Sequence, residues 1–124
     1  MYTHIPPKEI ESRSLAIIDS EVPEPRPFRD QEWAVVRRMI HTTADFSLLE
    51  SVRLHPLAIQ AGIDALRKGA DIVTDTQMAL AGIPVRRLQP LKCSARCVMG
   101  EAEIATQAQS QGVTRAWAAV DAIM

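Results

Sequence analysis

Apolar residues near the N-terminus recur at the three- and four-residue spacing that is typical of amphipathic helices. The range 8–20 contains three isoleucines that share one side of such a helix: Ile10, Ile17 and Ile18. Residues 1–7 contain two prolines, and residues 22–29 contain three more. The pattern therefore predicts a helix from Lys8 to Ser20, between an extended lead-in and a stiff, polyproline-like connector.

A second amphipathic helix is predicted over the range 30–41. Its apolar side consists of residues spaced three and four apart, namely Trp33, Val36 and Ile40. Asp30 precedes them and can cap the first turn. The polar residues after His41 are expected to form a turn. Residues 48–54 fit a strand or a short helix equally well, because their periodicity does not distinguish the two.

Helices and strands alternate in the second half of the chain. A helix is predicted over 56–68, with Gly69 as its C-cap. Its buried stripe would consist of Ile59, Gly62, Ile63 and Leu66. A short buried strand is expected over 71–74, and Asp75 or Thr76 would cap the helix that follows it. Polar residues just beyond a strand of this kind lie where open α/β sheets usually bind ligands.

The last third of the sequence continues this alternation. A loop over 84–91 precedes a predicted strand over 92–99, and a helix over 101–110 ends at Gly112. The inner face of that helix would carry Ile104 and Ala108. Thr114 is a natural N-cap for a final helix. The core-facing residues of the final helix would be Trp117, Val120 and Met124.

This order of elements predicts an α/β layered domain with a mostly parallel sheet. A chain of 124 residues has the length of one domain, and 47% hydrophobic residues can build its core. A sheet that is incomplete in this chain would have an unpaired edge. We therefore expect residues 1–124 to form a single domain that self-associates.

Charge and composition exclude several functions. The formal net charge is −1 and no basic tract occurs, which argues against nucleic acid and against an anionic membrane surface as partners. No apolar run is long enough to cross a bilayer, and the N-terminus does not resemble a secretory signal, so the expected compartment is the cytoplasm. Cys93 and Cys97, four residues apart in a predicted strand, are expected to be buried thiols. Neither they nor the three histidines have metal-ligand spacing, so no metal or cofactor is expected.

Two candidate functional side chains lie at the end of the second predicted helix. Arg38 and His41 are three residues apart and project from one side of it. A fixed cation would then lie beside the side chain that titrates near neutral pH. A purely structural alternative is a helix-end histidine that the helix dipole favours. Arg115 offers a third candidate, because a guanidinium beside free backbone N–H groups in a first helical turn suits a carboxylate.

Four stretches, taken in order, resemble the motifs of one enzyme family. They are residues 10–18 (Ile-Glu-Ser-Arg-Ser-Leu-Ala-Ile-Ile), 38–46 (Arg-Met-Ile-His-Thr-Thr-Ala-Asp-Phe), 72–83 (Ile-Val-Thr-Asp-Thr-Gln-Met-Ala-Leu-Ala-Gly-Ile) and 111–120 (Gln-Gly-Val-Thr-Arg-Ala-Trp-Ala-Ala-Val). The family is precorrin-8X methylmutase, also called cobalt-precorrin-8 methylmutase, of cobalamin biosynthesis. The resemblance covers nearly the whole chain. Family members continue past the position of Met124, so the chain resembles the N-terminal part of the enzyme.

The resemblance implies a Rossmann-like fold and a homodimer with the substrate near the subunit interface. It implies an isomerase that moves a methyl group from C-11 to C-12 of precorrin-8X or cobalt-precorrin-8, which gives hydrogenobyrinic or cobyrinic acid without a separate methyl donor. His41 would be the catalytic proton donor. Two arginines would hold substrate carboxylates, Arg38 and Arg115. Three hydroxyls would add hydrogen bonds, those of Ser14, Thr42 and Thr76.

Two alternatives remain open at this point. One is a non-catalytic module that binds a tetrapyrrole of the corrinoid class without turnover. The other is a structural or interaction fragment that binds no ligand. Visible spectroscopy separates all three, because an enzyme converts the corrinoid, a binding module only shifts its spectrum, and a structural fragment does neither.

Overall fold

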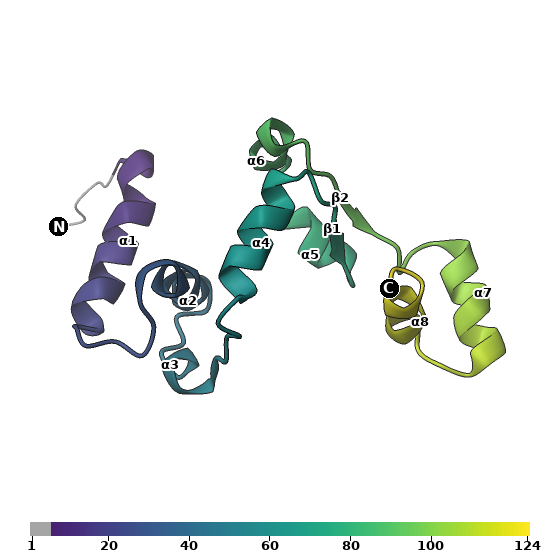
Figure 1. Cartoon of the computed structure of the whole chain (residues 1–124), viewed down its shortest axis with the longest axis horizontal. Coiled ribbons are helices and arrows are strands. Elements are labelled where there is room, and N and C mark those ends of the chain that lie inside the picture. Colours follow the sequence, from purple (N-terminus) through teal and green to yellow (C-terminus); the bar gives the residue numbers. More distant parts are fainter. Residues whose placement is uncertain (1–5) are drawn as a thin grey trace. The chain divides into compact units, whose positions relative to one another are not determined.

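A computed structural model describes residues 6–124 of the chain, and its described residues fall into two compact units. One unit ends at Ile59 and the other begins at Gln60. Most of the predicted extended lead-in, residues 1–5, lies outside the described residues. Figure 1 labels the elements in chain order.

The N-terminal unit consists of three helices: α1 (Pro7–Glu21), α2 (Asp30–Thr43) and the single turn α3 (Leu48–Ser51). α1 packs against α2, which also contacts α3. In Figure 1, α2 is seen nearly end-on where α1 lies along the page, so the two helices cross. The core between them contains Ile18, Val22, Phe28, Trp33, Val36 and Ile40. This core confirms the apolar face predicted for α2.

The ends of α2 differ from the prediction. Asp30 has a left-handed backbone (φ 48°) and Arg29, whose backbone is extended, occupies the N-cap position. Because a capping side chain needs that extended backbone, the prediction of Asp30 as the cap was wrong. At the other end, the hydroxyls of Thr42 and Thr43 donate to carbonyl oxygens one turn back. They extend the helix through Thr43, where a polar turn had been predicted.

The connector over 22–29 contains no helix or strand. Its peptide bond between Glu24 and Pro25 is cis. Arg26 anchors it by donating from Nε to the carbonyl of Val22 at 2.6 Å, and its guanidinium lies 4.6 Å from the centre of the Trp33 ring. The connector is therefore held against the helices.

The C-terminal unit is built around a two-stranded parallel sheet. Its strands are β1 (Ile72–Thr74) and β2 (Ala95–Cys97), and they pair in the register Ile72↔Ala95, Val73↔Arg96 and Thr74↔Cys97. The helix α4 (Ala58–Arg67) precedes β1. The short helix α5 (Gln77–Ala81) packs against both strands. This small parallel sheet among helices confirms the predicted mixed α/β class.

A pair of helices completes the C-terminal unit. α7 (Ala102–Gln111) ends at Gly112, which is left-handed (φ 66°), and α8 (Arg115–Asp121) begins behind Thr114. The hydroxyl of Thr114 accepts from the backbone N–H of Trp117 at 3.2 Å, as an N-cap should. α7 and α8 pack on each other over a second core of Val98, Ile104, Ala108, Ala118 and Ala119.

The predicted core of the last helix was wrong. Trp117, Val120 and Met124 are exposed by 54%, 50% and 100% within this unit, whereas Ala118 and Ala119 are buried. The small alanine side chains form the contact with α7. The spacing of apolar residues in the sequence could not reveal which face of α8 is buried, because apolar residues lie on both sides of the helix.

Three further predictions need correction. The range 84–91 is not a loop but contains α6 (Val85–Leu88) and a 3₁₀ turn (Gln89–Leu91), because Leu88 is buried. β2 is shorter than predicted, since Lys92 is left-handed and Cys93 lies outside the ladder, where its thiol donates to the carbonyl of Leu66 at 3.1 Å. Both cysteines are only half-buried.

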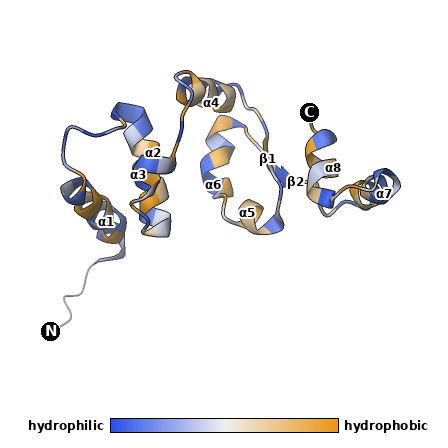
Figure 2. Ribbon diagram, turned by 90° about the horizontal axis from the view of Figure 1, so that it is seen from below, coloured by the Kyte–Doolittle hydropathy of each residue, from blue (hydrophilic) through white to orange (hydrophobic). Residues whose placement is uncertain are grey.

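The stripe predicted for α4 is also less buried than expected. Gly62 is exposed, while the other three members, Ile59, Ile63 and Leu66, are half-buried. Figure 2 colours α4 largely in the orange tones of hydrophobic residues. Its predicted end is confirmed, because Gly69 follows it with a left-handed backbone (φ 79°). None of the helices in the described part of the chain combines the length and apolar character needed to cross a membrane.

Candidate active site

A groove of about 370 Å³ opens on the N-terminal unit between α1, α2 and the residues that follow α2. Most of its lining is apolar: Ile10, Ile17, Ile18, Ile40, Ala44 and Phe46. The polar lining consists of Arg13, Ser14, Glu21 and His41. An apolar hollow with few polar groups is the usual form of a site for an organic ligand.

Ser14 and His41 meet at this groove. The Ser14 hydroxyl lies 2.7 Å from Nδ1 of His41, and both side chains are partly buried. Ile18 and Ile40 are buried, 5% and 1% exposed, and this burial sets how α1 and α2 are rotated toward the core. The hydroxyl can donate to a neutral Nδ1 or accept from a protonated one. No partner of Nε2 is recorded among residues 6–124, so Nε2 is the nitrogen that a ligand can use.

An ion pair joins the same two helices one turn away. The guanidinium of Arg38 contacts the carboxylate of Glu11, and both side chains are about half exposed. Arg38 and His41 thus reach α1 from one side of α2, as their spacing predicted. Glu11 was not among the predicted site residues, although its three-residue spacing from Ser14 repeats that of Arg38 and His41.

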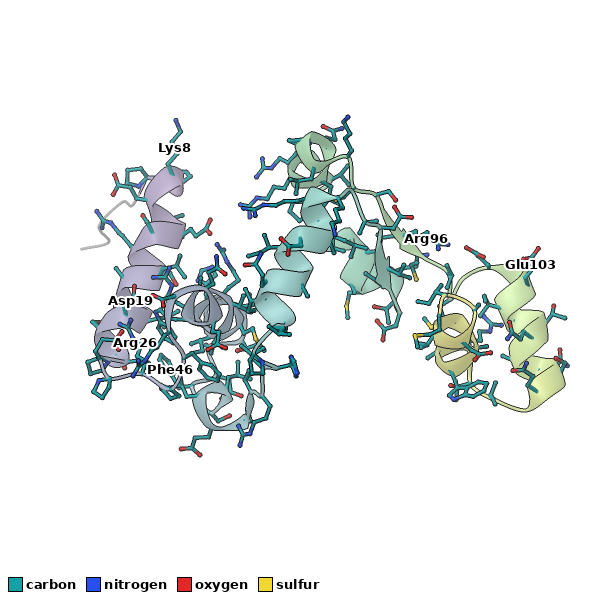
Figure 3. The ribbon with its side chains drawn as sticks, in the orientation of Figure 1. Lys8, Asp19, Arg26, Phe46, Arg96 and Glu103 are labelled. Atoms are coloured by element: carbon teal, nitrogen blue, oxygen red, sulfur yellow. The ribbon has the colours of Figure 1, made fainter. Side chains whose placement is uncertain are left out.

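A larger cluster centred on Asp19 links α1, the connector and α2. Its carboxylate accepts from Nε1 of Trp33 at 2.8 Å and from Arg37. Arg26 lies 3.7 Å from it, and Figure 3 labels Asp19 and Arg26. Burial raises the pKa of the Asp19 carboxyl, but the hydrogen bonds from Trp33 and Arg37 and the charges of Arg37 and Arg26 together lower it below its ordinary value. Sequence analysis missed this cluster because its members are spread over three segments.

The side chain of Thr42 forms a hydrogen bond within α2 in this structure. Its hydroxyl donates to the carbonyl of Arg38 at 3.0 Å, and the side chain is exposed at the end of α2. Asp45 follows, and hydrogen bonds from Ser47 lower the pKa of its carboxyl. Both residues belong to the motif around His41, and these contacts hold the end of α2 in place.

The remaining predicted residues belong to the C-terminal unit. The hydroxyl of Thr76 accepts from the backbone N–H of Ala79 at 3.1 Å, which confirms Thr76 as the cap of α5. Arg115 stands exposed in the first turn of α8, and no ion pair of its guanidinium is recorded within the described residues. A second hollow of about 370 Å³ lies at the carboxyl end of β1, where Thr74 and Asp75 line it together with Val120. Polar residues thus line a hollow at this strand end, where ligands were expected.

The family model for precorrin-8X methylmutase matches residues 9–124. The chain belongs to the precorrin-8X methylmutase family. The cobalt-precorrin-8 methylmutase of Leptospira interrogans is 42% identical over 109 residues, which are 88% of this chain and 49% of that protein. The cobalt-precorrin-8 methylmutase of Salmonella typhimurium is 40% identical over 121 residues, which are 93% of this chain and 57% of that protein.

A solved structure agrees with this membership in the precorrin-8X methylmutase family. The precorrin-8X methylmutase of Thermus thermophilus superposes with a TM-score of 0.80 at 37% identity, over 92% of this chain and 54% of that one. The fold that the four motifs implied is therefore confirmed. The chain spans about half the length of these relatives.

Proposed function

We propose that this chain supplies the N-terminal part of a precorrin-8X methylmutase. The reaction would move a methyl group from C-11 to C-12 of precorrin-8X or cobalt-precorrin-8 and give hydrogenobyrinic or cobyrinic acid. The observation that carries the proposal is the hydrogen bond between Ser14 and His41 at the margin of an apolar groove. It joins two of the family-like motifs in one place.

The chemistry needs one proton at the right position. The methyl group migrates within the substrate, so no donor is consumed and the product is an isomer of the substrate. The proton delivered as the conjugated system rearranges is therefore balanced by one proton that the rearranged ring releases, which returns the imidazole to its protonated form. In our proposal the protonated imidazole of His41 is the general acid. Ser14 holds Nδ1, so that the proton leaves from Nε2 toward the substrate.

The groove fits one part of such a substrate. Its volume of about 370 Å³ is near the lower end of ligand sites, so we assign to it one edge of the macrocycle. Arg115 has no recorded partner in the described chain, which suits it to one of the substrate's many carboxylates. Arg38, Thr42 and Thr76 stay predicted binding residues, although each makes a contact within the protein here.

Assembly and location also belong to the proposal. We propose a homodimer with the substrate near the subunit interface, and one domain in which residues 1–124 form the N-terminal part. The exposed apolar side chains of α8, among them Trp117 and Val120, support burial against further protein. A cytoplasmic location, and the absence of nucleic-acid or membrane partners, stay predictions from the sequence.

The test replaces His41 in an active methylmutase that contains this sequence. His41→Ala should bind the product with nearly normal affinity but lose turnover by about 10²–10⁴, the usual scale for general acid catalysis. His55→Ala is the matched control, since His55 is exposed and its Nδ1 accepts from the backbone N–H of Leu57 two residues away. Conversion and binding are followed by the visible spectrum of the corrinoid.

Other outcomes would assign a different function. If His41→Ala kept full turnover with an unchanged pH profile, the proton would come from another group. If the unsubstituted protein shifted the corrinoid spectrum without conversion, it would be a tetrapyrrole-binding module. If it neither shifted the spectrum nor converted the corrinoid, it would be a structural or interaction fragment that binds no ligand.

A further inference from the structure

Two contacts between α1 and α2 repeat the same spacing. Glu11 and Ser14 are one turn apart on α1, and their partners Arg38 and His41 are one turn apart on α2. Side chains three residues apart lie on one face of a helix. The ion pair and the Ser14–His41 hydrogen bond therefore lie next to each other along the same helix contact.

The position of Ser14 on α1 is informative. Glu11 stands three residues before it and Asp19 stands five residues after it, and both form ion pairs with α2. The Asp19 cluster anchors one side of the crossing, next to buried Trp33. The Glu11–Arg38 pair is a side-chain link between the two helices on the other side of Ser14. Without it, α1 could pivot about the Asp19 cluster and carry the Ser14 hydroxyl away from His41.

We propose that Glu11 and Arg38 act as a positioning pair, which holds the Ser14 hydroxyl on Nδ1 of His41 and leaves Nε2 to the ligand. Neither residue is a catalytic residue in this role, because the ion pair acts through the helix contact. The importance of the pair for catalysis rests on the proposed function, but the positioning of His41 does not. This role differs from the one predicted for Arg38, in which its guanidinium holds a substrate carboxylate.

The pair should have a moderate effect. Both side chains are about half exposed, at 48% for Arg38 and 47% for Glu11, so water screens their attraction. Exposed ion pairs of this kind change an equilibrium by about a factor of two to five. Loss of either partner should therefore reduce the ratio of hydrogen-bonded to free His41 by a similar factor and leave the fold intact.

The experiment measures His41 directly in the full chain without substrate. Histidine labelled with ¹⁵N reports the hydrogen-bond and tautomer state of Nδ1 and Nε2 by NMR, and His41→Gln identifies the signals of His41. Ser14→Ala defines the shifts of a ring without the hydroxyl. We expect Glu11→Ala and Arg38→Ala each to move the Nδ1 shift a clear part of the way toward the Ser14→Ala value. The double variant should move it by less than the sum of the two single effects, because both substitutions remove the Glu11–Arg38 ion pair.

The matched control is Glu9→Gln, which removes an ion pair of similar exposure (Glu9 49%, Arg13 52%) that lies within α1 alone. It should leave the His41 shifts unchanged. The exchanged pair Glu11→Arg with Arg38→Glu should restore them, which a general loss of folding would not allow. Far-UV circular dichroism of each variant confirms that the helices persist.

Wild-type shifts in Glu11→Ala or in Arg38→Ala would overturn the proposal. So would an equal movement in Glu9→Gln, since the effect would then not depend on the link between helices. In an active methylmutase, the positioning role lowers kcat for Glu11→Ala with little change in KM, whereas loss of a carboxylate clamp would raise KM for Arg38→Ala alone. The NMR measurement needs no turnover. It therefore tests the positioning of His41 even if the proposed function is wrong.

Discussion

The carboxylate of Asp19 should make the largest single polar contribution to the stability of the N-terminal unit. It accepts hydrogen bonds from Trp33 and Arg37 and lies near Arg26, so it joins α1, the connector and α2. Replacing it by alanine removes all of these contacts together. We predict that Asp19→Ala lowers the free energy of unfolding of this unit by about 2–3 kcal/mol.

The magnitude follows from the exposure of each partner. Trp33 is only 6% exposed, and its indole N–H, left without an acceptor, costs about 1–3 kcal/mol. The Asp19 side chain is 34% exposed, so water screens its ion pair with Arg37, which adds about 0.2–1 kcal/mol. Asp19→Asn keeps an acceptor for Trp33 and loses only the charge, so it should cost about 1 kcal/mol or less.

The assay is urea unfolding followed by tryptophan fluorescence. A Trp117→Phe background leaves Trp33 as the reporter, since Trp117 lies in the C-terminal unit. The midpoint and slope of the transition, and not the emission intensity, give the change in stability, because the substitution also alters the surroundings of the indole. Glu24→Gln is the control, since Glu24 pairs with Arg26 but is 66% exposed, and it should cost less than about 0.5 kcal/mol.

Two results would refute this reasoning. If Asp19→Ala cost no more than Glu24→Gln, the carboxylate would be effectively solvated and the apolar core alone would hold the unit. If Asp19→Asn cost as much as Asp19→Ala, charge and not the hydrogen bond to Trp33 would be the larger contribution. The first result would also remove the anchor on which the pivot of α1 depends.

The remaining predictions concern acid unfolding of the N-terminal unit and core packing in the C-terminal unit. The pKa of Asp19 is lowered from its ordinary value of 3.8, so its stabilising effect is complete above that pH and is lost as the pH falls through the lower folded value. Unfolding of the N-terminal unit between pH 5 and 2 should therefore be less steep in Asp19→Asn, and an unchanged acid transition would contradict this. Ala118→Leu should destabilise the C-terminal unit by about 1–3 kcal/mol, because Ala118 is fully buried between α7 and α8. Exposed Ala116→Leu in the same helix should be nearly neutral in thermal unfolding, and equal losses would show that α8 does not pack as described.

Several features of this protein follow from local physics, so the sequence alone predicts them. The hydroxyls of Thr76 and Thr114 cap helices because each accepts an N–H from its own first turn. Gly69 and Gly112 end helices because they adopt a left-handed backbone without steric cost. The spacing of Trp33, Val36 and Ile40 likewise determines which face of α2 is buried. Motif order was enough to identify the family.

Tertiary structure decided the features that depend on distant partners. Ser14 reaches His41 across 27 positions of sequence, and Glu11 reaches Arg38 across the same separation, so local spacing could offer only candidates. In α8, the small side chain of Ala118 is buried against α7, whereas the large side chain of Trp117 is exposed. The space between the two helices, and not the hydrophobicity of a residue, determines which side chain is buried there. The range of β2 was decided in the same way, since a strand extends only where a neighbouring strand offers hydrogen-bond partners, and β1 offers them to three residues.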